Sequence, residues 1–444
     1  MRRISPILLS CIISSPVFAA PTLYTCSPED FGGVADGHTV ETSAIQQAID
    51  SCSQHGGGTV KLGPGVWVSG PLTLKSNVSF IIPENTTLQA VDDKNAFVPA
   101  FIGQQAQKRE AFIMADNIYN SSISGGGSIN GNGNKTWWPD ALALRKEVRS
   151  GHPEAFTDRY KGIPLANGMP RPWLVEINNS SFIKINNIHL ENSPMWNLVL
   201  RKSHNIDVDK IQINNPPESP NTDGIDIVSS TDINIQHADI STGDDHIAIK
   251  SGIKRASGET SGNINISHSI MRLGHGISIG SETINGIGNV SVSDVNFVNS
   301  ENGIRVKSGR DRGNLIGPFI INNVSMTNVA TPLLITDSYS GQAGAAGNSL
   351  VSPVEYNNLT QTTPLISGVS VHNLKATNAR YAMILSGLPE APIKNLKIEN
   401  VSITAEQGIQ ARYVSGDLKN VSIKTVKGSD VTRGPDVNLN NTMR

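Results

Sequence analysis

A short alternation of apolar and polar residues recurs along most of this chain. Each copy places isoleucine, valine or leucine at every second position, and adjacent copies that can be compared start about 23 to 31 residues apart. Alternation with period two predicts β-strands with one buried face, and repetition at this spacing is typical of solenoids, in which successive coils stack. The clearest copies begin at Phe182, Asn205, Asp232, Asn263, Asn289, Gly368, Asn395 and Asn420.

The irregular spacing favours strand coils with loops of variable length over helical repeats. A β-sandwich or a propeller is the alternative, but propeller blades repeat at a longer and more regular period. Most copies also place asparagine, aspartate or glycine just before the strand, and stacked asparagines can hydrogen-bond along a coil axis. We therefore predict an all-β fold, a parallel β-helix in which residues 20–444 form one domain.

Three segments depart from the strand pattern. Apolar residues at helical spacing over residues 39–53, followed by three glycines, predict one helix that covers the open end of the solenoid. Residues 139–172 are rich in charge and proline, which predicts a long loop on one rim. The tail beyond Lys427 is expected to be frayed.

The N-terminus has the pattern of a secretory signal sequence. Two arginines precede an apolar run that ends in small residues, which predicts cleavage after Ala19 and a signal peptide over residues 1–19. No other apolar stretch is long enough to span a bilayer, so we expect a secreted, soluble protein. After cleavage Cys26 and Cys52 remain, an even pair in an oxidising compartment, and we expect a disulfide between them.

Composition excludes several partner classes. The net charge is −2, so nothing global points to nucleic acid or to a membrane surface, and a polyanion would have to meet a local basic patch. No cluster of histidine, cysteine and carboxylate suggests a transition metal. We therefore expect no cofactor and no metal, and a monomer.

Three aspartates lie in two short segments about one repeat apart. Asp223 ends Asn221-Thr222-Asp223, and Asp244 and Asp245 follow Gly243. If coils stack like parallel strands, side chains one coil apart lie about 4.7–4.9 Å from each other. Any one of these aspartates alone would be a common turn residue. Together they predict a carboxylate cluster, in which mutual repulsion raises one pKa, as acid/base hydrolysis requires.

Two further motifs follow at about one coil each. His275 lies between Gly274 and Gly276, and the glycines are expected to let the backbone approach a ligand closely. Arg305 and Lys307 project from the same face of a strand. By themselves they would be a solvated strand face. In register with three aspartates they predict a binding site for carboxylates, and hence an acidic sugar as substrate.

These motifs, in this order and spacing, resemble the signature of the polygalacturonases, pectin-cutting glycoside hydrolases of family 28. The likeness covers nearly the whole mature chain. It implies a single-stranded right-handed parallel β-helix and hydrolysis of α-1,4-galacturonan with inversion. The residues that carry it are Asn221-Thr222-Asp223, Gly243-Asp244-Asp245, Gly274-His275-Gly276 and Arg305-Val306-Lys307.

The resemblance also implies a role for each catalytic residue. Asp244 would be the general acid that protonates the leaving oxygen. Asp223 and Asp245 would hold and activate the attacking water. His275 would support the protonation of the acid.

Four further residues would bind substrate by the same resemblance. Arg305 and Lys307 would bind galacturonate carboxylates, and Asn221 would help to orient the site. A tyrosine after the arginine–lysine coil also belongs to the family pattern, and Tyr339 is the candidate.

Alternatives remain open at this point. We favour endo-acting cleavage because no extra N-terminal domain is evident, but exo-acting cleavage depends on loops that a sequence does not show. Xylogalacturonan and rhamnogalacturonan are other possible substrates. A Ca²⁺-dependent pectate lyase could use the three aspartates as ligands, and a non-catalytic glycan-binding β-helix, such as an adhesin, would bind without turnover.

Overall fold

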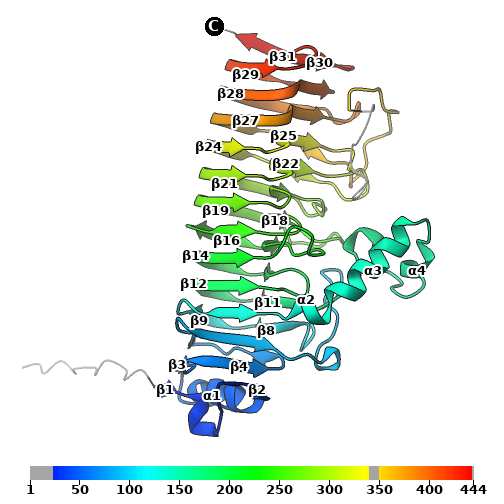
Figure 1. Cartoon of the computed structure of the whole chain (residues 1–444). Helices are drawn as coiled ribbons and strands as arrows, with labels where there is room; N and C mark the ends of the chain where they lie inside the picture. The colour runs from blue at the N-terminus through cyan, green and yellow to red at the C-terminus, as the bar shows by residue number, and fades with distance from the viewer. Residues whose placement is uncertain (1–23, 340–349, 443–444) are drawn as a thin grey trace, which may run out of the picture.

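The computed structural model describes residues 24–339 and 350–442. Their strands form one parallel sheet that winds into a tall β-helix, with successive coils stacked from the N-terminal to the C-terminal end (Figure 1). The predicted β-helix is therefore confirmed. The predicted signal peptide, residues 1–19, lies outside the described residues.

One ladder of strands carries the functional residues described below. Each of its strands pairs in parallel with the next coil, for example Ile225 with Ile247 and Ile277 with Ile304. In coil order the ladder contains β5 (Leu72–Thr73), β8 (Ala111–Asp116), β11 (Trp173–Asn178), β13 (Leu198–Arg201), β15 (Ile225–Val228), β18 (Ile247–Lys250), β20 (Ile277–Ile279), β22 (Asn302–Lys307), β25 (Thr331–Thr336), the later halves of β27 (Val369–Ser386) and β28 (Ile393–Arg412), and β30 (Val431–Arg433).

The remaining strands close the other faces of each coil. Several long strands bend midway and so contribute to two faces. They are β1 (Thr25–Cys26), β2 (Asp36–Val40), β3 (Gly58–Lys61), β4 (Gly65–Ser69), β6 (Val78–Ile81), β7 (Thr86–Ala90), β9 (Tyr119–Ser124), β10 (Ser128–Asn130), β12 (Ser181–Glu191), β14 (His204–Asn214), β16 (Thr231–Gln236), β17 (Asp239–Ser241), β19 (Ser261–Arg272), β21 (Ile287–Val298), β23 (Leu315–Ile316), β24 (Phe319–Thr327), β26 (Leu365–Ile366), β29 (Val414–Thr425) and β31 (Val437–Thr442).

The core consists of apolar columns that run along the coil axis. Ile225, Ile247, Ile277 and Ile304 occupy equivalent positions of successive coils, and each is fully buried. Because side chains alternate along a strand, the residue after each of them points outward. The alternation read from the sequence therefore fixes which residues point away from the core on each of these coils.

Asparagine ladders stabilise the bends between faces, as the sequence predicts. Asn328 donates its side-chain amide to Asn299 at 2.9 Å, and Asn378 donates to Asn328 at 2.7 Å. These asparagines have φ near +57°, a left-handed conformation that asparagine tolerates better than most residues. Each ladder thus combines a local bend with a bond to the coil below.

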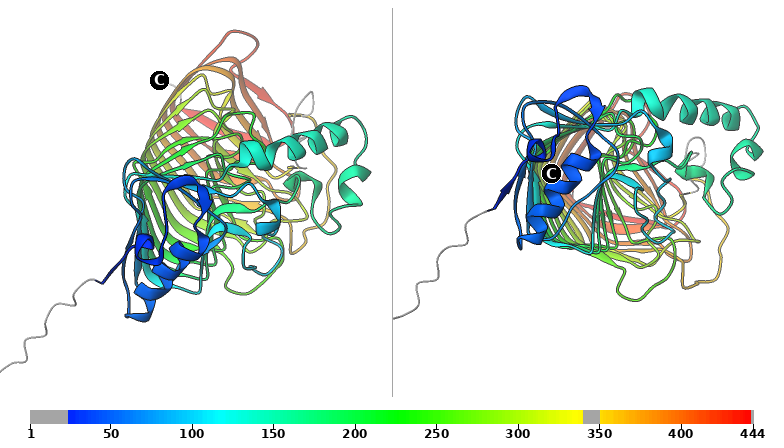
Figure 2. Two further views of the ribbon diagram at one scale, coloured as in Figure 1. Left: turned by 60° about the horizontal axis from the view of Figure 1, so that its bottom comes forward. Right: turned by 90° about the horizontal axis from the view of Figure 1, so that it is seen from below.

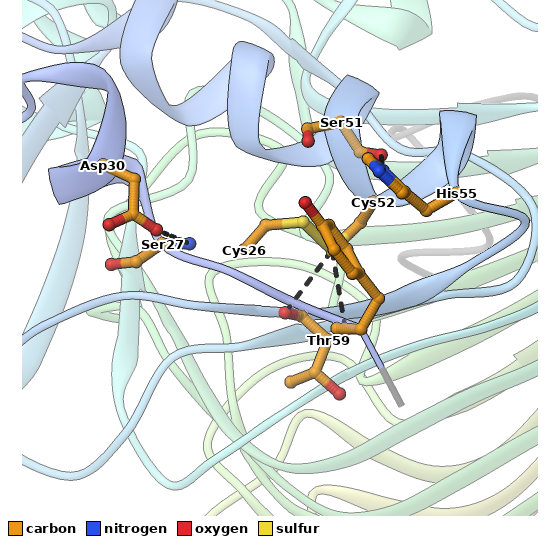
Figure 3. Close-up of a disulfide and its surroundings, with 8 residues drawn as sticks. Cys26, Ser27, Asp30, Ser51, Cys52, His55 and Thr59 are labelled. Atoms are coloured by element: carbon orange, nitrogen blue, oxygen red, sulfur yellow. Dashed lines mark hydrogen bonds between the residues drawn. A yellow bond between two sulfur atoms is a disulfide. The ribbon is translucent and has the colours of Figure 1, made fainter. Parts of the chain in front are cut away.

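A helix covers the N-terminal end of the stack. The sequence predicts it over residues 39–53, and α1 spans Thr42–Gln54, preceded by the short η1 (Pro28–Phe31). Figure 2 shows α1 lying across this end. The expected disulfide joins Cys26 of β1 to Cys52 of α1 (Figure 3). It ties the first strand to the helix that shields the core.

Replacing Cys52 with serine is expected to destabilise the protein by about 3 kcal/mol, because the bond closes a loop with a sequence separation of 26 residues. Urea unfolding followed by circular dichroism measures the change. The double variant Cys26→Ser/Cys52→Ser should lose no more than the single variant. An unchanged midpoint would show that the bond does not stabilise the folded state.

Two predictions about irregular segments are wrong. Residues 139–172 are not a plain loop, because α3 (Trp138–Arg149), α4 (Glu154–Thr157) and η3 (Leu165–Asn167) form a helical arm that follows α2 (Gly133–Thr136) and projects from the side of the stack (Figure 1). The C-terminal tail is not frayed, since β30 and β31 add to the last coil.

The arm holds its place by packing at its base. The apolar residues Trp137 and Trp138 are buried, and the indole nitrogen of Trp138 donates to Ser193 at 2.9 Å. Lys94 of the short η2 (Lys94–Ala96) forms an ion pair with Asp140.

Among the described helices, none is long and apolar enough to cross a lipid bilayer.

Candidate active site

A cleft of about 730 Å³ opens on the outer face of the ladder that contains β15, β18, β20 and β22. All eight non-cysteine residues singled out from the sequence line it. They are Asn221, Asp223, Asp244, Asp245, His275, Arg305, Lys307 and Tyr339.

Coil register brings the acids together. Asp223, Asp245 and His275 each lie two residues before an inward isoleucine of three successive coils, and those isoleucines pair in register. The backbone confirms the alignment, because Gly224 donates to the carbonyl of Asp245 at 2.9 Å. Residues far apart in the chain thus become neighbours along the coil axis.

The glycines of these motifs let adjacent coils pack closely. Close approach of the backbone to a ligand at Gly274 and Gly276 remains a prediction. A Cβ on Gly243 would lie 2.0 Å from the carbonyl oxygen of Ser219. At Gly276, where φ is +101°, a Cβ would lie 2.6 Å from the carbonyl oxygen of Gly303. Only glycine lets the turns before β18 and β20 stack this closely.

Asp245 is the most strongly held carboxylate of the cleft. It accepts hydrogen bonds from Arg305, from Nζ of Lys307 at 2.8 Å and from the hydroxyl of Ser278 at 2.9 Å. Although its burial acts in the opposite direction, the charges of Arg305 and Lys307 hold the pKa of Asp245 far below its ordinary value. Asp245 is therefore ionised, and it is an anionic partner of both cations.

Asp244 pairs with His275. Nδ1 of His275 lies 3.1 Å from a carboxylate oxygen of Asp244, and Nε2 lies 3.3 Å from Glu301. Burial alone would raise the pKa of Asp244, but the charge and hydrogen bond of His275 outweigh it and lower that pKa. Burial would likewise lower the pKa of His275, yet the Asp244 carboxylate raises it. The proton that Asp244 and His275 share therefore rests on His275.

Asp223 is the carboxyl group with the raised pKa. It is buried, and desolvation together with the charges of Asp244 and Asp226 raises its pKa well above the ordinary value. The sequence predicts that repulsion within the cluster raises one pKa and leaves one acid protonated. Asp223 is therefore the carboxyl group of the cluster that holds a proton most strongly, whereas the pKa of Asp244 is lowered.

A second ion cluster in the same cleft was not predicted from the sequence. Nζ of Lys250 lies 3.6 Å from Asp226 and 3.3 Å from Glu282, and 4.9 Å from the ring centre of Trp196. Burial disfavours the charged lysine, but these carboxylates raise its pKa. The sequence gives one sign of this cluster. Asp226 and Lys250 alternate with the buried isoleucines of their strands, so both side chains are expected to point outward.

The helical arm and its C-terminal connection also reach the site. Arg145 of α3 donates to the side chain of Asn221 at 3.1 Å. The fully buried Arg171 donates to the carbonyls of Pro194 and Pro220, each at 2.7 Å, and fixes the segment that leads to Asp223. Neither arginine belongs to a repeat, so sequence periodicity gave no reason to select them.

Tyr339 lies beside the cation pair, where the sequence placed its candidate. Nζ of Lys307 is 5.5 Å from the centre of the Tyr339 ring. Burial raises the pKa of the Tyr339 hydroxyl to about 12, so it remains a hydrogen-bond donor throughout the physiological range.

The cluster of Asp244, Asp245 and His275 has its candidate ligand atoms within 4.8 Å of one another, close enough for a metal ion. A divalent cation here would meet Arg305 and Lys307, which already bind both oxygens of Asp245. Like charge at this distance opposes metal binding. The donor set therefore fits acid/base chemistry better than a calcium site.

This chain is similar in sequence and in fold to known proteins. An endo-polygalacturonase of Pectobacterium carotovorum subsp. carotovorum is 34% identical over 405 residues, which cover 88% of this chain and 89% of that protein. The solved polygalacturonase of Erwinia carotovora ssp. carotovora superposes with a TM-score of 0.66 at 28% identity, covering 95% of this chain and all of that one.

An exopolygalacturonase of Thermotoga maritima shares the fold with a TM-score of 0.74 at 24% identity, covering 91% of this chain and 93% of that one. The model of the glycosyl hydrolases of family 28 matches residues 52–426, which include every candidate residue of the cleft. The chain belongs to glycosyl hydrolase family 28.

Proposed function

We propose that this protein hydrolyses the α-1,4-galacturonosyl linkages of homogalacturonan, with inversion at the anomeric carbon. The observation that carries the proposal is the juxtaposition of three aspartates with Arg305 and Lys307 in one cleft. The acids supply hydrolysis and the cations favour a polyanionic sugar. Family membership and the names of the similar proteins support it.

In this proposal Asp244 is the general acid. It donates a proton to the leaving glycosidic oxygen as the bond between that oxygen and the anomeric carbon breaks. His275 holds the proton before the reaction and transfers it to Asp244, over the 3.1 Å contact between them, as negative charge develops on the leaving oxygen.

Asp223 reacts as the ionised carboxylate, after losing its proton to solvent before the substrate binds. Water attacks the anomeric carbon from the face opposite the leaving oxygen and gives one proton to Asp223, which has the higher proton affinity of the two remaining carboxylates. Asp245, held by two cations, is the weaker base and orients the water as a fixed acceptor. Asn221 positions this segment through its bonds with the two arginines.

Substrate carboxylates are proposed to bind at Arg305, Lys307 and Tyr339. Arg305 donates to Ser278 and Lys307 donates to Asp245. Both groups have further N–H donors, from which a carboxylate of the substrate can accept hydrogen bonds. Tyr339 adds a neutral hydroxyl donor.

Product analysis tests the reaction class. Digestion of polygalacturonate should release reducing ends without ultraviolet absorbance, and the rate should not change when a chelator is added. An unsaturated, ultraviolet-absorbing product or loss of activity with chelator would identify a lyase instead. Proton NMR of the first product should show the β-anomer, since inversion converts the α-linkage.

Export of the protein is part of the proposal. The apolar N-terminal segment predicts it, and the disulfide between Cys26 and Cys52 is a bond that persists in oxidising compartments.

The position of cleavage along the polymer is a finer question. The sequence favours endo-acting cleavage, and the Pectobacterium relative bears that name. The shape of the cleft in this chain favours attack near a chain end.

A further inference from the structure

We infer that one end of the cleft is closed, and that Arg145 at this closed end binds a carboxylate of the terminal sugar residues, so that the enzyme cleaves near chain ends. The inference rests on the proposed function, since it concerns how galacturonan lies in the same cleft. It replaces the endo-acting cleavage that the sequence favours.

The outer face of the ladder is covered on the N-terminal side of the acids. Trp196 lies one coil before Asp223, and Trp173 one coil before that. The two indoles stack with their centres 5.3 Å apart and a 4° angle between planes, and both are buried. Phe101 and Ile102 belong to the same buried apolar cluster as these indoles. A polymer could not continue along this face without displacing these side chains.

The cover is anchored by polar contacts as well. The backbone of Ala100 donates to the carbonyl of Arg171 at 3.1 Å, and the carbonyl of Gln104 accepts from the buried Arg201. Arg201 also lies 3.3 Å from Glu110 and 3.4 Å from Glu176. These buried ions would be costly to expose without partners. Residues 97–110 therefore form a fixed plug at this end of the cleft.

The acids lie asymmetrically between the two ends. Trp196, Asp245 and Tyr381 each lie two positions before a paired residue of the ladder, so their separations can be counted in coils. Trp196 is two coils before Asp245. Tyr381, which lines the far end of the cleft, is four coils after Asp245. Two coil spacings are about 10 Å, roughly the length of two sugar rings. The closed side can thus accept only a short end of the polymer.

A cation faces this short side. Arg145 comes from α3 of the helical arm, lines the cleft, and is half-buried. Arg145 donates from one of its nitrogens to Asn221, and a guanidinium has five N–H donors. The remaining donors can bind a galacturonate carboxylate at the closed end.

The wild-type enzyme tests the closed end directly. Polygalacturonate should yield mono- or digalacturonate from the first minutes, with viscosity falling slowly relative to reducing ends. A rapid fall in viscosity with mixed oligomers would overturn the inference while leaving the proposed function intact. Absence of any reducing ends would overturn both.

Arg145→Gln tests the cation. The variant should raise KM for galacturonate oligomers about tenfold with little change in kcat, and Arg145→Lys should recover part of the affinity. Arg159→Gln, at an exposed position of the same arm, is the matched control and should behave as wild type. A fall in kcat at unchanged KM would mean that Arg145 acts only by positioning Asn221, and would overturn its role in binding.

Discussion

Replacing Asp244 with asparagine is expected to lower kcat on polygalacturonate by about 10³-fold, within the range that general acids contribute. The amide matches the carboxylate in size and can still accept the hydrogen bond that the backbone of Asp245 donates at 3.0 Å. It has no acidic proton to give to the leaving oxygen. Reducing-end release at saturating substrate measures the loss, and thermal unfolding shows whether the fold is kept.

A matched control separates the loss of the acidic proton from the general effect of removing one negative charge. Asp207→Asn makes the same replacement on an exposed position of a neighbouring coil, outside the cleft, and should leave kcat unchanged. If Asp244→Asn retained near wild-type turnover while Asp207→Asn did the same, Asp244 would not be the acid. His275 would then be the remaining proton donor of the pair.

The sequence predicts this site well because the repeat itself fixes the geometry. Once period-two strands stack at a coil spacing, the outward position after each buried isoleucine is determined. Arg305 and Lys307 are therefore assigned to one face without any structure, and Asp223 and Asp245 to neighbouring rows. The Asp244–Asp245 pair needed one more fact, that the turn before β18 leaves the strand geometry, and the structure supplies it.

Elements outside the repeat could not be predicted in the same way. The helical arm does not follow the repeat of the coils, and its charged residues resemble those of an exposed loop. No sequence pattern therefore predicts the contact of Arg145 with Asn221. The plug at residues 97–110 depends on tertiary packing against Trp173 and Trp196. The ion pairs of Arg305 and Lys307 with Asp245 could not be predicted either, because they depend on side-chain conformation.

Because it is paired with Asp245, Lys307 has two proposed roles: it binds a substrate carboxylate, and it lowers the pKa of Asp245. Lys307→Met keeps the length and the apolar stem of the side chain but removes the ammonium group 2.8 Å from Asp245. KM should rise about 10- to 100-fold, since a hydrogen bond to a charged group contributes about 1.5–3 kcal/mol. Initial rates over a range of oligomer concentrations measure this change. Lys184→Met, an exposed lysine on another face, should leave KM unchanged.

The same variant should change the titration of Asp245 in a defined direction. Arg305 and Lys307 lower the pKa of Asp245, so its carboxylate is ionised above that pKa and is protonated as the pH falls through it. Without Lys307 the pKa of Asp245 rises, and carbon-13 NMR of labelled aspartate should show Asp245 titrating at higher pH. The acidic limb of kcat/KM should stay in place, because the higher pKa of Asp223 sets it. If KM rose while the titration of Asp245 did not move, Lys307 would bind substrate without tuning Asp245, because electrostatic coupling between the two residues is what links the ammonium group to that titration.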